Sequence, residues 1–151
     1  MGRYSDAPRG ERIDGQSDPA AAIAQHWPPD GPHTTEAVRS AAEAFAEIAR
    51  YLARSTMRPD AFPHAGDVYA VLAELRSGIG RLDQTLAQVS SHTAAFADDP
   101  ALYDDRGPAH DPARAVREVQ GGLDAARVAL GPVLAALDSA HSSAGHLGHR
   151  A

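Results

Sequence analysis

The chain has 151 residues, a length that suits one modest domain, and it has no cysteine, which excludes disulfides and thiolate metal sites. Its net charge is −6 and its arginines form no basic run, which argues against direct binding of nucleic acid. The first residues lack the apolar stretch of a signal peptide, and nowhere do about 18 apolar residues run together. We therefore expect a cytoplasmic protein without membrane contact.

The N-terminal segment, residues 1–33, is polar and rich in Gly, Pro and Asp. It offers too little apolar surface to offset the entropy of ordering, so we predict a flexible tail. Inside it, Asp18 precedes a proline and an apolar run, which predicts a short helix over 19–27. The same Asp-Pro-Ala unit recurs at Asp99 and Asp111, where it predicts two further helix starts.

Residues 34–147 are predicted to form one helical domain, because three segments space their apolar residues at alternating steps of three and four. The first segment begins at Thr34 or Thr35, the second covers about 67–97, and the third begins at Asp111. The apolar positions are Val38, Ala41, Phe45, Ile48 and Leu52; then Val68, Leu72, Leu75, Ile79, Leu82, Leu86, Val89, Thr93 and Phe96; then Val116, Val119, Leu123, Ala126, Leu130, Val133, Leu137, Ala140, Ala144 and Leu147.

These segments predict an all-α protein, an antiparallel bundle of three long helices with a short N-terminal helix in a flexible tail. Connections of about ten to thirteen residues are too short to return the chain along a helix of about 30 residues, which favours the antiparallel order. The heptad spacing is typical of coiled coils. Residues 148–151 are predicted to be disordered.

The sequence LAELRSGIGRLDQTL, residues 72–86, contains a Gly-x-Gly pair that raises the question of a phosphate-binding loop. A dinucleotide-binding loop needs a third glycine three positions later, and that position holds Asp83, whose carboxylate repels phosphate. The apolar stripe also continues through Gly78 and Gly80, so we predict helix. Each glycine then costs about 1 kcal/mol against alanine, and Gly78 would allow a neighbouring backbone to come close.

The third segment contains Gly121, Gly122 and Pro132, all unfavourable inside a helix. Pro132 falls outside the apolar stripe, so a continuous helix that bends there is one prediction. The alternative is a break at Gly121 or Pro132 into shorter helices.

No motif of a di-iron, zinc-protease, serine-hydrolase or nucleotide-binding site occurs, so we predict a non-enzymatic protein without cofactor. His141, His146 and His149 are spaced so that no single helical face carries all three, and we expect them to be solvated rather than to bind zinc. The aspartates of segment 98–111 lack the alternation and the terminal Glu of a calcium loop. They are predicted to cap helices and to keep the loop in water.

Lys and Asn are absent, as expected for a strongly GC-rich coding sequence. Three further features are the stretch YLARSTMRPDAFPHAGDVYAVLAELRSGIGRLDQTLAQVSSHTAAF, the Asp-Asp-Arg-Gly turn after it and the alanine-rich last segment. In these features the chain, over about 34–147, resembles a group of uncharacterised small helical proteins of high-GC bacteria, some encoded near conjugation or integrative-element genes. The resemblance implies a genomic association with mobile elements, and it assigns no activity and no functional residue.

The first long helix, about 22 residues, is too short to cover the seams of the other two. We therefore predict an interaction module, an adaptor or accessory protein that binds a protein partner or forms a homo-oligomer through an apolar heptad seam. Leu86, Val89 and Phe96 are the predicted partner-binding residues. The alternatives are a bundle that binds a small ligand or metal, and a regulator that acts through a DNA-binding partner.

Overall fold

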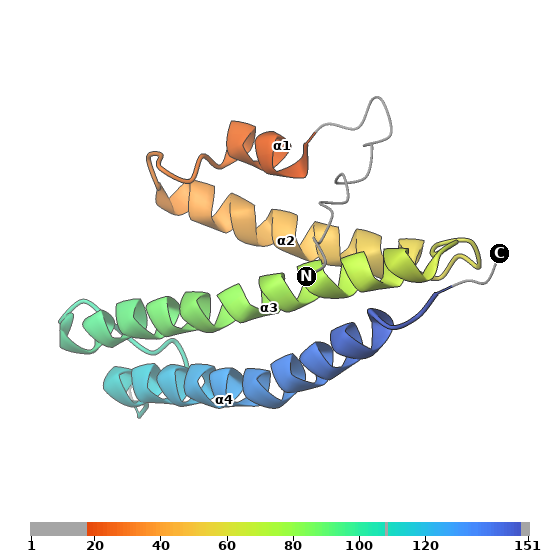
Figure 1. Ribbon diagram of the computed structural model, residues 1–151. Coiled ribbons are helices and arrows are strands. Elements are labelled where there is room, and N and C mark those ends of the chain that lie inside the picture. Colours follow the sequence, from red (N-terminus) through yellow and green to blue (C-terminus); the bar gives the residue numbers. More distant parts are fainter. Residues whose placement is uncertain (1–17, 108, 149–151) are drawn as a thin grey trace, which may run out of the picture. The chain divides into compact units, whose positions relative to one another are not determined.

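The computed structural model describes residues 18–107 and 109–148, and within them every regular element is helical, which confirms the all-α class. The elements are α1 (Pro19–His26), α2 (Thr35–Ser55), α3 (Ala65–Ala94), the 3₁₀ turn η1 (Ala95–Asp98) and α4 (Pro112–Ala144) (Figure 1). No helix of the described residues is long and apolar enough to cross a membrane. The chain divides into two units, Met1–Arg58 and Pro59–Ala151, and each is described here by itself.

The helices of the first unit begin where the sequence predicts. The Asp18 carboxylate accepts a hydrogen bond from the Ala20 amide at 3.1 Å, and α1 follows. The Thr34 hydroxyl accepts from the Ala37 amide at 3.1 Å and caps α2. Both caps bind amide groups that the first turn leaves without an internal partner. The predicted tail extends over 1–33, and its first seventeen residues lie outside the described part of the chain.

Charged and apolar side chains occupy opposite faces of α2. Its six charged residues share one face, at spacings of three and four, and its large apolar residues share the other. The charged residues are Glu36, Arg39, Glu43, Glu47, Arg50 and Arg54. Phe45 and Ile48, on the apolar face, remain 55% and 48% exposed, and α2 has no buried residue.

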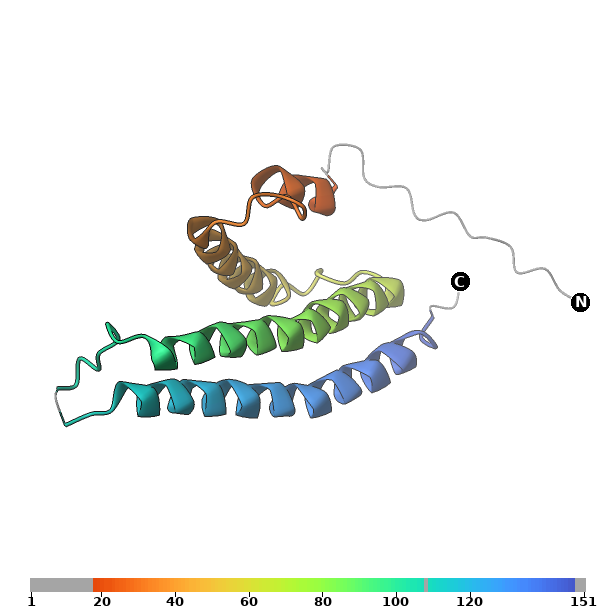
Figure 2. The same cartoon turned by 90° about the vertical axis from the view of Figure 1, so that its left-hand side faces the viewer.

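The second unit is a hairpin of two long antiparallel helices, α3 and α4, which lie side by side in both views (Figures 1 and 2). Asp67 accepts from the His64 amide at 2.9 Å and fixes the start of α3. The helix continues through Gly78 and Gly80, as the apolar spacing predicts, and ends in η1. An added Cβ at either glycine would meet nothing within 4 Å, so the hairpin itself gives no packing reason for them.

The predicted helix start at Asp99 is wrong. The Asp99 carboxylate accepts from the Ala101 amide at 2.9 Å, as a cap would, but the chain forms only a turn in which the Leu102 amide bonds to the Asp99 carbonyl. Asp residues often form such turns in place of a helix, and no apolar stripe follows Asp99 whose burial would stabilise a helix. At Asp111 the same unit does begin a helix, α4.

Helix α4 is continuous from Pro112 to Ala144, so the alternative of a break at Gly121 or Pro132 is not what the structure shows. The helix curves along its length (Figure 1). Pro132 cannot donate to the carbonyl of Val128, and since Val128 is 78% exposed and Pro132 is exposed too, the missing hydrogen bond lies on the solvent side of the helix. The cost of the missing bond is reduced because water can reach the free carbonyl.

Candidate functional site

The heptad seams of α3 and α4 divide into two rows with different exposure. An inner row, at every seventh position, is half-buried or buried along its whole length. It consists of Leu72, Ile79, Leu86 and Thr93 on α3, and of Val116, Leu123, Leu130, Leu137 and Ala144 on α4. Val116 and Ala144, near the two ends of α4, are each only 6% exposed. This row forms the contact between the two helices.

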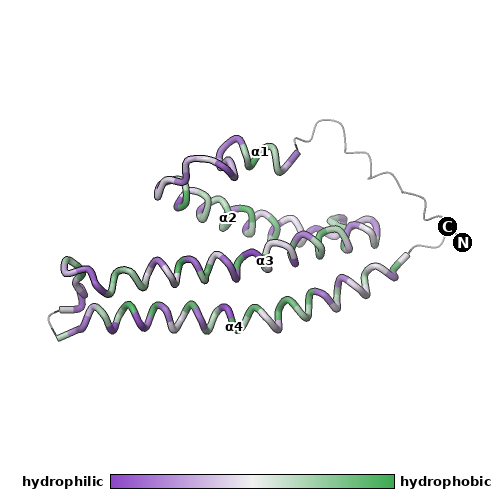
Figure 3. Tube along the Cα trace, turned by 60° about the vertical axis from the view of Figure 1, so that its left-hand side comes forward, coloured by the Kyte–Doolittle hydropathy of each residue, from purple (hydrophilic) through white to green (hydrophobic). Residues whose placement is uncertain are grey.

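The second row, three positions after the inner row on each helix, is open to solvent. We call it the apolar edge: Leu75, Leu82, Val89 and Phe96 from α3 and η1, and Val119, Ala126, Val133, Ala140 and Leu147 from α4 and the turn that follows it. All nine except the half-buried Leu82 are classed as exposed, with Val119 at 49% and Phe96 at 52%. Figure 3 shows that polar and apolar residues alternate along both helices.

Helix geometry places both halves of the apolar edge on the same side of the hairpin. A step of three residues turns a side chain about 60° away from the helix contact. In an antiparallel pair this turn has the same direction on both helices, because the two are related by an approximate two-fold axis perpendicular to them. The apolar edge is therefore one continuous surface, shared by α3 and α4.

Polar contacts close the opposite side of the hairpin. Arg127 of α4 donates to Asp83 of α3 at 3.0 Å, and Arg76 pairs with Asp138. The ring of Tyr69 stacks on that of His141, with centroids 4.1 Å apart. Tyr69, Arg76 and Asp83 are seven residues apart, like the rows beside them. This polar edge fixes the register of the helices but contributes little to stability, because its ion pairs are partly exposed.

The structure separates the three residues predicted to bind a partner. Leu86 belongs to the inner row and is half-buried. Val89 and Phe96 belong to the apolar edge, where Val89 is 46% exposed. The sequence prediction did not include Val119, which lies opposite Val89 on α4. The sequence did contain a signal for this surface in the charged positions 76, 83, 127 and 138. Pairing them across the two helices would have shown which side of the hairpin is polar and, by exclusion, which side is apolar and exposed.

The loop between η1 and α4 is shaped by one carboxylate. Arg106 donates to both oxygens of Asp104, from Nε at 2.9 and 3.1 Å and from Nη2 at 2.6 Å, and its backbone amide donates to Oδ1 at 3.0 Å. These hydrogen bonds from Arg106 lower the pKa of Asp104 from 3.8 to about 2. Gly107 closes the turn with φ of 115°, which favours glycine.

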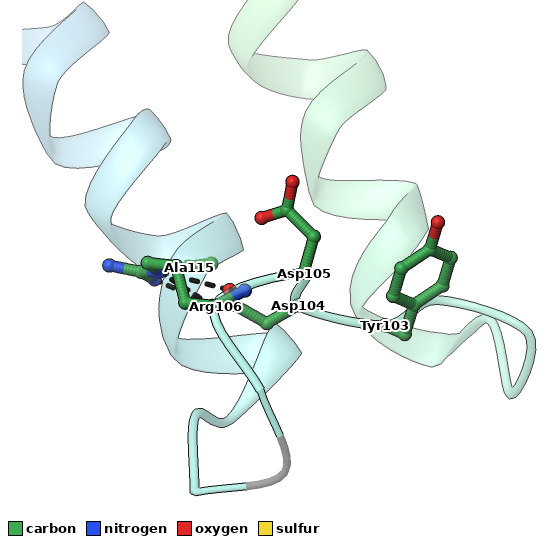
Figure 4. Close-up of a pocket in the computed structure, with 5 residues that line it drawn as sticks. All are labelled: Tyr103, Asp104, Asp105, Arg106 and Ala115. Atoms are coloured by element: carbon green, nitrogen blue, oxygen red, sulfur yellow. Dashed lines mark hydrogen bonds and ion pairs between the residues drawn. The ribbon is translucent and has the colours of Figure 1, made fainter.

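A hollow of about 410 Å³ lies at the loop end of the hairpin, and Figure 4 shows the residues that line it. Its walls are Tyr103, Asp104, Asp105, Arg106 and Ala115. Ala115 lies one turn before Val119 and faces the same side of α4, so the hollow adjoins the apolar edge. Tyr103 is 80% exposed, and its ring extends from the loop beside the end of α3 (Figure 4). The hollow is open, and it combines an aromatic ring with a carboxylate.

The histidines predicted to be solvated differ in their surroundings. His146 is exposed, and His149 lies outside the described residues. His141 is half-buried, and within the described part of the chain its Nε2 has no hydrogen-bond partner. Across residues 18–107 and 109–148, no group of three His, Asp or Glu side chains lies close enough to hold a metal ion.

A second, smaller hollow of about 160 Å³ lies in the first unit, where the segment after α1 folds back on the start of α2. Trp27 and several proline rings line it, together with Val38 and Ala41. Trp27 is half-buried there and meets the His26 ring edge to face at 5.7 Å. The aromatic ring thus covers part of the first turns of the α2 apolar face.

No protein-family model, curated protein or solved structure matches this chain. The resemblance to small helical proteins of high-GC bacteria gains no support from these comparisons and stays a prediction.

Proposed function

We propose that the protein is a non-enzymatic interaction module that binds a protein partner, or a second copy, through the apolar edge of the α3–α4 hairpin. One observation carries this proposal: apolar residues recur at every seventh position on one side of the hairpin and all but Leu82 are exposed, while polar pairs close the other side. A continuous exposed apolar surface of this kind is uncommon on a monomer and marks contact sites. Its spacing fits a helix laid along it.

Part of the apolar edge has a candidate occupant in the chain itself. We propose that α2 packs along it, so that α2, α3 and α4 form an antiparallel three-helix bundle. The apolar face of α2 is exposed and matches the edge in spacing. Nine residues, 56–64, join α2 to α3, and so short a tether gives a high effective concentration. With the two helix ends adjacent, Phe45 would lie beside Leu75.

The α2 helix is too short to cover the whole apolar edge. It has 21 residues against 30 in α3, or about 31 Å against 45 Å at 1.5 Å per residue. In the register that pairs Phe45 with Leu75, the N-terminal end of α2 lies near residue 85 of α3. Val89 and Phe96, and Val119 across from them, would stay open to a partner, with Leu86 at the border.

The three-helix arrangement is tested by an engineered disulfide in a chain that has no cysteine of its own. Phe45→Cys combined with Leu75→Cys should oxidise rapidly, because a bundle brings the two Cβ atoms within bonding range. The matched control is Glu43→Cys with Leu75→Cys, since Glu43 lies on the charged face of α2. Equal oxidation of both pairs, or of neither, would reject this position for α2.

Partner binding is tested by photo-crosslinking in the native host. A crosslinking amino acid at Val89 or Phe96 should capture the same protein, because both side chains lie on the open part of the edge. The control places it at Asp124, an exposed residue of α4 outside the seam. The function would be refuted if the control captured the same proteins as the two test positions.

A further inference from the structure

Unpaired negative charge lies beside the open end of the apolar edge. Residues 98–118, which form the loop and the start of α4, contain six carboxylates and three arginines, a net charge of −3. The arginines are engaged within this segment: Arg106 with Asp104, Arg114 with Glu118 at 2.8 Å, and Arg117 with Asp111 at 3.2 Å. The excess charge is therefore not neutralised locally.

Asp98 and Asp105 carry this excess most directly. Both are exposed, and neither forms an ion pair within residues 18–107 and 109–148. Asp98 ends η1, two residues after Phe96. The Asp105 side chain forms a wall of the hollow that contains Ala115, and so lies on the side of the hairpin that carries Val119 (Figure 4). Both carboxylates thus belong to the loop end of the hairpin and form no ion pair among the described residues.

The positions that flank the apolar edge along the helices are uncharged. Next to the apolar edge, α3 has Gly78, Thr85 and His92, and α4 has Ala115, Gly122 and Ala129. These mostly small side chains leave room for a helix to lie close to the hairpin, and they offer it no charge. An occupant therefore meets apolar contacts along the edge and negative charge at the loop end alone.

We propose that the occupant of the loop end, formed by Val89, Phe96 and Val119, is an amphipathic helix of a partner protein with arginine or lysine residues beside its apolar stripe. The inference rests on the proposed function and names the chemistry of the partner. Its apolar residues pack on the edge, and its basic residues meet Asp98 and Asp105. Charge complementarity of this kind adds specificity and speeds association.

The same charges disfavour a second copy of this chain at the loop end. Where the two-fold axis passes through the loop end, each loop would face its own counterpart, and two segments of net charge −3 would repel. An acidic partner is disfavoured for the same reason.

The test uses the full chain and two designed helical peptides of 18 residues. Both have the same leucine stripe, and they differ only in four flanking positions, which are arginine in one and glutamate in the other. Fluorescence anisotropy measures their binding. We expect the arginine peptide to bind about tenfold more tightly or better, an advantage that falls as salt rises. Phe96→Ala should weaken it at least about tenfold.

A pair of matched double variants separates local from overall charge. Asp98→Asn with Asp105→Asn should remove most of the advantage of the arginine peptide. Glu43→Gln with Glu74→Gln removes two exposed carboxylates elsewhere, neither in an ion pair within the part of the chain that the structure describes, and should leave the advantage intact. Circular dichroism melting of every variant establishes that each is folded.

The outcomes separate the inference from the proposed function. Equal binding of both peptides, with loss in Phe96→Ala, would refute the basic partner and leave the interaction module standing. Equal effects of the two double variants would also refute it, since overall charge would then explain the preference. Binding of neither peptide, with dimers of the protein that Phe96→Ala disrupts, would make a second copy the occupant. Binding of neither peptide without such dimers would count against both proposals.

Discussion

At the scale of single residues, the loop depends on the hydrogen bonds between Asp104 and Arg106. The Asp104 side chain is only 4% exposed, and the guanidinium and amide of Arg106 satisfy both of its oxygens. Its partner Arg106 also lies 3.9 Å from Glu118 of α4. The pair thus connects the turn to the first part of α4 and holds Asp105 at the hollow.

The lowered pKa of Asp104 predicts how the loop responds to acid. Because the folded pKa, about 2, lies below the ordinary 3.8, the pair contributes stability that is fully present above about pH 4. That contribution is lost as the pH falls from 4 towards 2. An NMR titration of the Asp104 carboxyl should have its midpoint near 2. Arg106→Gln should return the midpoint towards 3.8, and an unchanged midpoint would contradict the assigned cause.

Glycine substitution gives a second prediction at this scale. Gly80→Ala should raise the free energy of unfolding by about 0.5–1 kcal/mol, because alanine reduces the entropy of the unfolded chain and the new Cβ meets nothing within 4 Å. Urea denaturation measures the change. Gly78 has the same free space within the hairpin but flanks the apolar edge, so Gly78→Ala should stabilise less if α2 packs there. Destabilisation by Gly80→Ala would contradict the uninterrupted helix.

At the scale of elements, the hairpin uses half of each seam. The inner row packs α3 on α4, and the apolar edge remains largely exposed. Two rows of similar apolar residues thus have different roles. In this hairpin each helix turns its inner row towards its neighbour, and the apolar edge, three residues further on, points about 60° away from that contact. The second row needs a third helix or a partner.

The two rows should differ in their effect on stability. Leu130→Ala, in the inner row of α4, should cost about 2 kcal/mol or more, because it leaves a cavity between the helices. Phe96→Ala should cost less than about 1 kcal/mol, since more than half of the ring is already exposed. Chemical denaturation with circular dichroism compares them. If Phe96→Ala proved the more damaging, the apolar edge would be assigned to the wrong row.

At the scale of the whole molecule, the chain forms two units, and each exposes an apolar face. The first has the apolar face of α2, and the second has the apolar edge of the hairpin. Isolated two-helix hairpins bury little apolar surface, and small units of this size are marginally stable. Burial of the apolar face of α2 against the apolar edge would increase the stability of both units.

Removal of the first unit tests this dependence. The fragment 59–151 should melt at a lower temperature than the full chain and should self-associate at tens of micromolar, because its entire apolar edge is then exposed. Circular dichroism and analytical ultracentrifugation measure the two effects. A fragment that stays monomeric and has the same melting temperature as the full chain would show that α2 does not stabilise the hairpin.

The sequence by itself determined the local structure of most of this protein. Alternating steps of three and four located α2, α3 and α4, and hydroxyl and carboxylate caps located the starts of α1, α2 and α4, because both signals depend on residues within one or two turns. The same locality explains the error at Asp99, where a turn uses the same cap. Local pattern also predicted that α3 passes through Gly78 and Gly80.

Only the tertiary structure decided which half of each seam is buried. Leu86 and Val89 are equivalent in the heptad pattern, yet one is half-buried and the other is exposed, since the direction in which α3 faces depends on contacts with α4 such as Asp83 with Arg127. The continuity of α4 through Pro132 likewise depended on the exposure of the freed carbonyl. The contact of Asp83 with Arg127 joins residues 44 positions apart, and spacing along the chain carries no record of it.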